Sequence, residues 1–423
     1  MAARLVDRVN GVSADGSTSS RVRGPLGLLH RFESVGRSYV EERPRLDSPW
    51  LPAGVLLILA AAFVLVRLAV AAHGDVSTFV QAGTQFVDPT KAPHGLAIRS
   101  GAGFDGQFYY RLALQPWNMA WSAHGITFDF AYRRQRITYS WFAWVFSGGQ
   151  SAAVPYVLVG INIAMLGLMG FVCGTWAKSL GRHALWGLLP AGYFGMVWSL
   201  DRDLTEITAI TLVVAGIVAW RHRRFLVAGL ALSGAVLARE TALLVVAALF
   251  VTRLVEIVRR RDRVGAQDVT WAAPAIAFVG WQALCFAVYG TLPLTSDTGN
   301  AATPFSGAVH AVVGWIGHPK LTNLLELIQL VVLVVVIVLG LLHLRDSRSS
   351  SFEKLAFLFA VLLLAVLSPT VWNNDPREFR TMVDVFVLGS GVLLGSRSFR
   401  PLVLTGLTWG VWLLVAGVSV KYI

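Results

Sequence analysis

The chain has 423 residues, of which 55% are hydrophobic and only 14% are charged, against about 25% charged residues in an average soluble protein. Several apolar runs reach about 20 residues, the length of a helix that crosses about 30 Å of hydrocarbon. An ordinary soluble enzyme is therefore excluded, and so is a membrane β-barrel, whose strands alternate in polarity. Cys173 and Cys285 both lie inside apolar runs, so neither a disulfide framework nor a cysteine metal site is expected.

The N-terminal segment, residues 1–50, is basic, with eight arginines. We expect it to be cytoplasmic and partly disordered, with an interfacial helix over Pro25–Tyr39. No cleavable signal is expected, because the first apolar run begins near Leu51 and has full membrane length. Residues 51–423 are predicted to form a single transmembrane domain.

The apolar periodicity predicts an all-α polytopic protein of about eleven transmembrane helices. Phe225–Ala238 is short for a span and is predicted to be a half-helix that meets its successor at Arg239-Glu240. The amphipathic segment Ile137–Phe146 is placed on the membrane surface. The eleven predicted spans are Leu51–Ala72, Val154–Ala177, Ala184–Leu200, Leu204–Trp220, Phe225–Ala238, Thr241–Val258, Val269–Val288, Leu321–Leu344, Phe352–Val371, Thr381–Gly395 and Pro401–Val420.

The distribution of positive charge predicts the orientation of these spans. If residues 1–50 are cytoplasmic, every short turn on the same side carries lysine or arginine, as the positive-inside rule requires. The net charge of +12 is then explained by this bias and by attraction to anionic membrane lipid. It does not indicate a nucleic-acid partner, which would need a clustered basic face with base-contacting groups.

Two connections on the predicted extracytoplasmic side are long, residues 73–136 and residues 289–320. The second is rich in Thr, Ser, Gly and Asn, which fits either a flap over a cavity or a passive connection. The first contains the block Gly103-Phe104-Asp105-Gly106-Gln107-Phe108-Tyr109-Tyr110-Arg111. Glycines on both sides of an acidic residue permit unusual backbone angles and close approach of the backbone. Asp105 is therefore either an N-terminal cap of the helix that follows or a functional carboxylate.

The GFDGQFYY block, together with Arg-Gln-Arg-Ile-x-Tyr at 134–139 and Ala-Arg-Glu-Thr-Ala-Leu-Leu at 238–244, resembles a bacterial group of GT-C superfamily membrane glycosyltransferases. The resemblance extends from about residue 50 to the end of the chain. It implies a GT-C-like helical bundle whose long first extracytoplasmic loop carries surface helices. It also implies a multi-pass protein of the bacterial plasma membrane that takes a polyprenyl-phosphate-linked sugar as donor and a cell-envelope glycan or glycolipid as acceptor.

The resemblance assigns the catalytic base to Asp105, because glycosyl transfer requires a group that takes the proton of the acceptor hydroxyl. Gln107 and Tyr110, from the same block, are expected to contact substrate. The superfamily pattern has two acidic residues, whereas the position after Asp105 is Gly106. Asp75 is the alternative base, and its competing interpretation is a cap or an interfacial polar residue.

The donor phosphate requires cations, since negative charge develops on the leaving group. Arg239 and Glu240 lie between two apolar half-spans, where they either neutralise each other or other buried groups, or Arg239 faces the phosphate. Arg377 and Arg380 belong to a charged segment that either lines the cavity or is a solvated loop. The arginines predicted to lie on the extracytoplasmic side are Arg111, Arg133, Arg134, Arg136, Arg202, Arg239, Arg377 and Arg380.

Asp201, Arg202 and Asp203, with Glu206, form a further cluster. It indicates either a helix N-terminus favoured by acidic residues or a site for acceptor hydroxyls or a divalent ion. The spacing does not demand a metal, so no metal ligand is assigned and no cofactor is expected, with a divalent metal left open. The chain has no Walker-type loop and no GxGxxG motif, which argues against ATP-driven transport and dinucleotide chemistry.

The sequence therefore predicts an integral membrane glycosyltransferase that moves a sugar from a polyprenyl-phosphate donor to an extracytoplasmic acceptor, with inversion at the anomeric carbon. Two alternatives stay open. A transporter or flippase of a lipid-linked saccharide also needs an amphiphilic cavity and buried charge. A non-catalytic scaffold for envelope assembly is the other, because a fold does not by itself determine activity.

Overall fold

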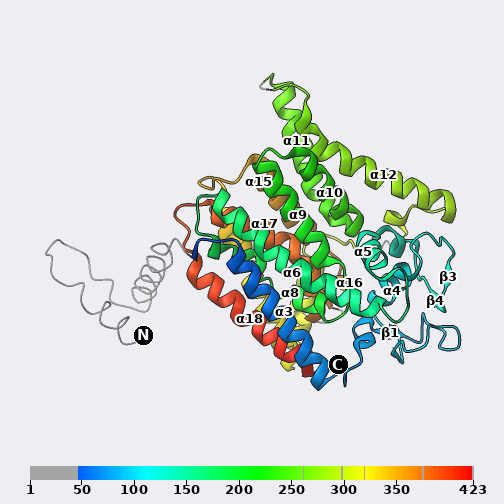
Figure 1. The fold of residues 1–423 in the computed structure, drawn as a ribbon. Helices are drawn as coiled ribbons and strands as arrows, with labels where there is room; N and C mark the ends of the chain where they lie inside the picture. Colours follow the sequence, from blue (N-terminus) through cyan, green and yellow to red (C-terminus); the bar gives the residue numbers. More distant parts are fainter. Residues whose placement is uncertain (1–45, 261, 297–298, 319, 374–375, 422–423) are drawn as a thin grey trace, which may run out of the picture.

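The computed structural model describes residues 46–260, 262–296, 299–318, 320–373 and 376–421. The expected interfacial helix over Pro25–Tyr39 lies outside these residues. The described chain is mainly helical, and its few strands are two residues long. One bundle of helices makes up most of the protein (Figure 1), and the helices α4 and α5 lie with the strands at one end of it.

Within the described part of the chain, six helical segments are long and apolar enough to cross a membrane, so the chain is a multi-pass membrane protein. Two of them begin with a short 3₁₀ turn that continues into an α-helix, η5 into α11 and η6 into α12. Each of the six segments carries exposed apolar side chains along its length, as expected for helices that face lipid. The six are α3 (Trp50–Val70), α6 (Val154–Ser179), η5–α11 (Glu240–Val258), η6–α12 (Ala266–Tyr289), α14 (Leu321–Leu342) and α18 (Pro401–Lys421).

The prediction of eleven spanning helices is therefore wrong, because the other five segments form shorter or interrupted helices. Residues 184–200 form three short helical pieces, 184–187, 188–191 and 195–200, and the second piece ends before Gly192, since glycine favours helix ends. A helix of 14 residues rises only about 21 Å, less than the hydrocarbon thickness of about 30 Å. The shorter elements are η4 (Ala184–Gly187), α7 (Leu188–Ala191), α8 (Gly195–Leu200), α9 (Glu206–Arg221), α10 (Phe225–Ala238), α15 (Ser351–Ala365) and α17 (Val383–Gly395).

Helix α17 lies at the centre of the bundle, and all of its residues are buried. It packs against α15, α14 and α7, and it also contacts α6. Gly391 allows the closest approach, because a Cβ atom there would lie 2.0 Å from the ring of Trp176. At the C-terminus of α17, Arg182 donates hydrogen bonds to the carbonyl oxygens of Leu394 and Ser396, and Ser347 donates to that of Val392.

The first long connection, residues 73–136, folds into a compact set of short elements at one end of the bundle, which we call the loop end. The helix predicted over Ile137–Phe146 is present as α5 and packs against α4 and α6, and its place on the membrane surface stays a prediction. The elements of the loop end are η2 (Val76–Val80), β1 (Ala82–Gly83), β2 (Ile98–Arg99), α4 (Gly106–Leu114), β3 (Ser122–Ala123), β4 (Ile126–Thr127), η3 (Ala131–Gln135) and α5 (Thr138–Ser147).

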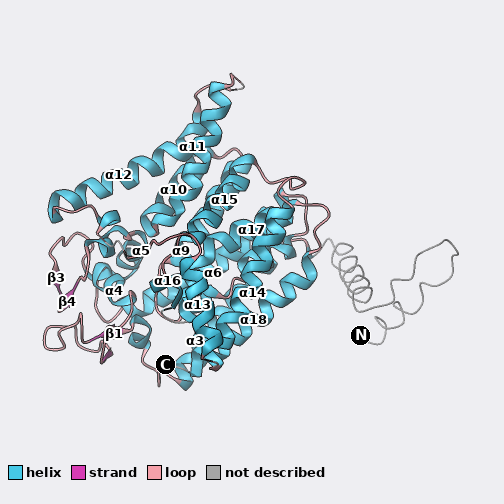
Figure 2. Cartoon of the chain, turned by 180° about the vertical axis from the view of Figure 1, so that it is seen from behind, coloured by secondary structure: helices cyan, strands magenta, loops and turns pink. Residues whose placement is uncertain are grey.

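The second long connection contains helix α13, which contacts α16 and α14 and is seen in front of the bundle in the reverse view (Figure 2). Its backbone is tied to the end of α15, since the amides of Ala302 and Phe305 donate to the carbonyl oxygens of Val366 and Ala365. It is therefore held against the bundle. The short elements of this region are η7 (Pro293–Thr295), α13 (Ser306–Gly317), α16 (Pro369–Asn373) and η8 (Pro376–Met382).

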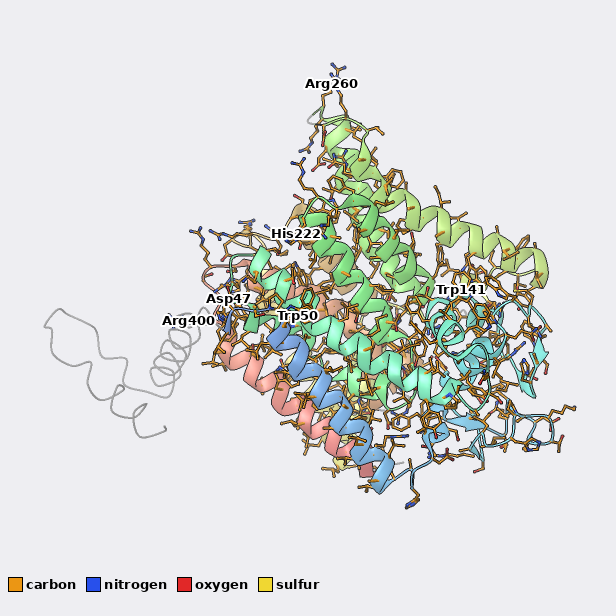
Figure 3. All side chains as sticks on the ribbon, viewed as in Figure 1. Asp47, Trp50, Trp141, His222, Arg260 and Arg400 are labelled. Atoms are coloured by element: carbon orange, nitrogen blue, oxygen red, sulfur yellow. The ribbon has the colours of Figure 1, made fainter. Side chains whose placement is uncertain are left out.

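Residues of the turns predicted to be cytoplasmic lie together, away from the loop end. Asp47, His222, Arg260 and Arg400 lie toward one end of the molecule in Figure 3, whereas Trp141 lies toward the other. This separation agrees with the arrangement that the charge distribution predicts. Which of the two ends faces the cytoplasm stays a prediction from the positive-inside rule.

Candidate functional site

The GFDGQ block fixes the start of helix α4 against two other backbone segments. Gly106 touches both, because a Cβ atom there would lie 2.4 Å from the carbonyl oxygen of Arg202 and 2.7 Å from that of Val80. Gln107 ties the same helix to β1, since its Oε1 accepts a hydrogen bond from the amide of Gly83 at 3.0 Å. Its Nε2 donates to the carbonyl oxygen of Ala102 at 2.9 Å. The block thus places Asp105 with little positional freedom.

Asp105 occupies the N-cap position of α4, yet its side chain makes no capping hydrogen bond. The cap interpretation of this residue therefore fails. Oδ1 lies 2.8 Å from Nη1 of Arg133, while the ion-pair contact of Oδ2 among the described residues is a long one, 3.9 Å to Nη1 of Arg136. The side chain of Asp105 is 16% exposed. Oδ2 is thus a carboxylate oxygen that is held in place but has no close ion-pair partner among the described residues.

Glu240 is bound far more completely than Asp105. Tyr132 donates its hydroxyl to Oε1 at 2.5 Å, and Gln135 donates its amide to Oε2 at 3.2 Å. Arg136 donates to both oxygens, from Nε at 3.0 Å and from Nη2 at 2.6 Å. All three donors come from the segment η3–Arg136, so Glu240 joins the first long loop to the start of the η5–α11 span.

Arg239 forms its ion pair with Glu206, not with Glu240. Its Nη1 lies 3.7 Å from Oε1 of Glu206, and Arg380 approaches the same oxygen with Nε at 3.2 Å. Arg239 is only 5% exposed, and its Nε and Nη1 have no hydrogen-bond partner among the described residues. The pairing of Arg239 with Glu240 that the sequence suggested is thus absent, and Arg239 retains N–H groups that a ligand could use.

These two groups of contacts interact electrostatically with each other at the loop end, and we call them together the central cluster. It is built where shorter helices end and begin, since α10 ends at Ala238, before Arg239, and α9 begins at Glu206. The charged ends of these helices explain why they do not extend to spanning length. The central cluster consists of Asp105, Arg133, Arg136, Glu206, Arg239, Glu240 and Arg380.

The arginines of the central cluster keep Asp105 ionised. Burial alone would raise the pKa of this carboxyl, but Arg133, Arg380, Arg136 and Arg239 together hold the pKa below its usual value. Burial raises the pKa of the neighbouring Tyr109 hydroxyl to about 12, so this phenol stays protonated. At neutral pH the site therefore presents a carboxylate among guanidinium groups.

Two residues that the sequence assigned to the site lie apart from the central cluster. Asp75 caps η2, because its Oδ1 accepts a hydrogen bond from the amide of Ser77 at 2.9 Å. That arrangement agrees with the cap interpretation. Tyr110 has a buried ring, and its hydroxyl donates to the carbonyl oxygen of Ser151 at 3.3 Å. The neighbouring Tyr109, not Tyr110, is the tyrosine that lies close to Asp105 and Arg136.

Asp201 and Arg202 form a second buried group, in which they pair with each other at 2.6 Å. Asp201 also forms an ion pair with Arg67, which comes from the α3 span. Glu206, which the sequence grouped with these residues, belongs instead to the central cluster through Arg380. Arg377 falls in η8, and its side chain lies outside the part of the chain that the structure describes.

The chemistry available to the central cluster is that of a carboxylate and several guanidinium groups. Among the described residues, no group of three or more His, Cys, Asp or Glu side chains could hold a metal ion. The carboxylate can accept a proton, and guanidinium groups bind phosphate or carboxylate with fixed geometry. The arrangement is therefore suited to a proton acceptor beside an anionic group.

Sequence reasoning missed several members of this network. Tyr132 and Gln135 were not singled out, although Tyr132, in η3, and Arg136, directly after η3, are four residues apart and both reach Glu240. Arg133 and Arg136 were named only among many extracytoplasmic arginines. Their proximity to Asp105 depends on how about 30 residues of irregular loop fold back, for which the sequence carries no local signal.

Comparison with known proteins adds no family assignment. No protein-family model matches the chain, and no curated protein matches it significantly. The resemblance to the GT-C superfamily thus remains an expectation from the motifs.

Proposed function

We propose that the protein is a membrane glycosyltransferase that moves a sugar from a polyprenyl-phosphate donor to a cell-envelope glycan or glycolipid. The observation that carries this proposal is the partly exposed Asp105 carboxylate, which has an uncommitted Oδ2 and is surrounded by arginines. Such an arrangement supplies a proton acceptor and an anion-binding group in the same place.

Asp105 is the proposed base. The hydroxyl oxygen of the acceptor forms a bond to the anomeric carbon, and its proton passes to Oδ2 of Asp105. The bond between the anomeric carbon and the phosphate oxygen breaks, and the phosphate departs with the electron pair. A single displacement of this kind inverts the anomeric centre. The lowered pKa of Asp105 favours the ionised form that the first step requires.

Arg239 and Arg380 are the proposed ligands of the departing phosphate, with Arg377 as a further ligand from the same segment as Arg380. Arg239 supports this role best, because it is buried and its Nε and Nη1 have no hydrogen-bond partner among the described residues. A preorganised cation that meets charge as it develops lowers the barrier without reorganisation. The lipid tail of the donor would lie between helices of the bundle.

The proposed location is the bacterial plasma membrane, with a cytoplasmic N-terminus and the central cluster on the extracytoplasmic side. Gln107 has a positioning role in this proposal, since both ends of its amide are bonded to the backbone. Asp201 and Arg202 take a supporting role, because their pair lies in the turn that touches Gly106.

The experiment that tests this proposal compares membranes that contain wild-type protein, Asp105→Asn or Asp88→Asn. The last variant is a matched control, because it replaces Asp by Asn at an exposed position of the same loop. The membranes are incubated with labelled polyprenyl-phosphate sugars and envelope acceptors, and release of sugar from the lipid is measured. We expect transfer by wild type and D88N and a loss of about 10²- to 10⁴-fold in D105N.

The other outcomes separate the rival functions. Transfer that persists in D105N would refute Asp105 as the base. No transfer by wild type with any donor, together with movement of labelled lipid between leaflets of reconstituted vesicles, would indicate a flippase. Absence of both activities would favour the scaffold.

A further inference from the structure

Two buried arginines near the central cluster have no carboxylate partner. Among the described residues eight arginines are buried, and six of them lie in ion pairs with Asp or Glu. The two exceptions are Arg111, at 2% exposure, and Arg134, at 0%. A buried cation without a counter-ion is strongly disfavoured unless another group compensates it. These two residues therefore need a separate explanation.

Backbone carbonyl groups partly solvate both guanidinium groups. Arg111 donates to the carbonyl oxygen of Trp121 at 2.8 Å and to that of Ala120. Arg134 donates from Nη2 to the carbonyl oxygen of Pro116 and lies 2.9 Å from Sδ of Met119. All four partners belong to one segment, Pro116–Trp121, which we call the strap. The strap thus holds both arginines with neutral acceptors.

Several donors beneath the strap are left without partners. Nε and Nη1 of Arg134 are buried and have no hydrogen-bond partner among the described residues. The same holds for Nε1 of Trp141 and for the hydroxyl of Tyr289. These groups are close together, since Trp141 and Arg134 both contact the ring of Trp281. Each of these groups can donate a hydrogen bond, and a buried guanidinium with unpaired N–H groups favours a negatively charged partner.

The position of this group relative to the membrane indicates the source of the anion. Tyr289 is the last residue of the η6–α12 span, so the group lies where that span meets the loop end. Tryptophan and tyrosine gather at the level of lipid headgroups. Here Trp117 contacts Trp141 and Trp121 contacts Tyr289, with ring centroids 5.4 and 5.5 Å apart. Trp117 and Trp121 are 63% and 43% exposed.

The charge of the group persists at neutral pH. Burial, together with the nearby Arg134, lowers the pKa of Arg111 to about 10, although Tyr289 acts in the opposite direction. Burial also lowers the pKa of Arg134. Both guanidinium groups still carry their charge near pH 7, and both would gain from a negative partner.

We propose that Arg111 and Arg134 bind the phosphate group of an anionic membrane lipid beneath the strap, at the membrane boundary of the loop end. The phosphate oxygens would replace the strap carbonyls and satisfy Arg134, and the lipid tails would lie along the exposed apolar face of α12. This site is distinct from the central cluster and does not depend on glycosyl transfer.

The test measures the thermal stability of purified wild-type protein in neutral detergent during three titrations. The probes are dioctanoyl phosphatidylglycerol, dioctanoyl phosphatidylcholine and inorganic phosphate. A ligand that binds only the folded state stabilises it by RT ln(1 + [L]/Kd), so Tm rises once the ligand concentration exceeds Kd. We expect stabilisation by phosphatidylglycerol that exceeds the effect of the other two probes. Equal effects of both lipids would refute the site, and equal stabilisation by inorganic phosphate would refute the lipid as its source.

The variants Arg111→Gln and Arg134→Gln assign the effect to the two arginines. Each is expected to weaken the apparent affinity for phosphatidylglycerol about tenfold, the loss for one hydrogen bond to a charged group. Lys91→Gln is the control, because it makes the same charge change at an exposed position of the same loop. An unchanged affinity in both arginine variants would overturn the proposal. If either variant does not fold, the three wild-type titrations still decide the outcome.

The lipid site and the proposed transfer reaction can fail independently. Asp105→Asn is expected to keep the full response to phosphatidylglycerol, because Asp105 contacts neither Arg111 nor Arg134. Conversely, a protein that transfers sugar but shows no lipid preference would refute this inference alone.

Discussion

The two carboxylates that flank Arg136 should respond in opposite ways to loss of charge. Glu240 accepts four hydrogen bonds, from Tyr132, Gln135 and twice from Arg136. Asp105 has one close contact, with Arg133, and is partly exposed. We therefore expect Glu240→Gln to destabilise the fold and Asp105→Asn to leave the fold largely intact while it abolishes activity.

The magnitudes follow from what each substitution leaves unpaired. Glu240→Gln leaves Arg136 buried beside a neutral amide, and removal of one partner of a buried ion pair costs about 3–5 kcal/mol. After Asp105→Asn, Arg133 keeps Asp129, to which it donates from Nε at 2.9 Å and from Nη2 at 2.8 Å. The remaining cost is that of a partly exposed pair, at most about 1 kcal/mol.

Thermal unfolding in detergent measures this difference directly, with the yield of monodisperse protein as a second readout. The expected order of Tm is wild type, then Asp105→Asn slightly lower, then Glu240→Gln much lower. A Glu240→Gln variant as stable as the wild type would refute the structural role of Glu240. An Asp105→Asn variant as unstable as Glu240→Gln would show that Asp105 is a structural carboxylate and would weaken its assignment as base.

Three further predictions test the placement of Asp105. Gly106→Ala should cost about 1–3 kcal/mol by overpacking, because its Cβ would lie 2.4 Å from a backbone oxygen, whereas Gly160→Ala, with no atom within 4 Å, should leave Tm unchanged or higher. Gln107→Leu should lower the stability by about 1–3 kcal/mol, since a buried backbone amide and a carbonyl lose their partner, again measured as Tm. The folded pKa of Asp105 is lowered, so the stability that its carboxylate contributes is complete above its unfolded pKa of about 3.9 and is lost as the pH falls through the folded value. The difference in Tm between wild type and D105N should therefore stay constant from pH 7 to about pH 5 and shrink below about pH 4.

The sequence was informative about the long apolar helices and less so about the short ones. Composition and run length identify a helix such as α14 with no further knowledge, and the ends of all six spanning helices agree with those of predicted segments to within about three residues. Residues 184–200 illustrate the failure. They were predicted as one span but form the three short elements η4, α7 and α8, whereas the end of α10 before Arg239 agrees with the predicted half-helix Phe225–Ala238.

The candidate site shows a similar division. Glycines around Asp105 marked a place of close backbone contact, and the contacts of Gly106 with two carbonyl oxygens agree with that interpretation. The same block gave Gln107 a substrate role, whereas the structure has both ends of its amide bonded to the backbone. Sequence also could not pair Glu206 with Arg380, because these residues are 174 positions apart and meet only through the packing of η8.

The central position of α17 has a consequence for biosynthesis. Trp176 lies in α6, and its ring packs on Gly391 of α17. Helix α6 is completed long before the ribosome reaches Gly391. Helices made early must therefore wait in the bilayer with an incomplete interior until residues 383–395 have been translated. A chain that stops before α17 lacks the helix around which α7, α14 and α15 pack. The bundle can therefore assemble only after its early helices have been inserted. A truncation near the C-terminus that removes α17 should prevent folding as completely as a truncation near the N-terminus.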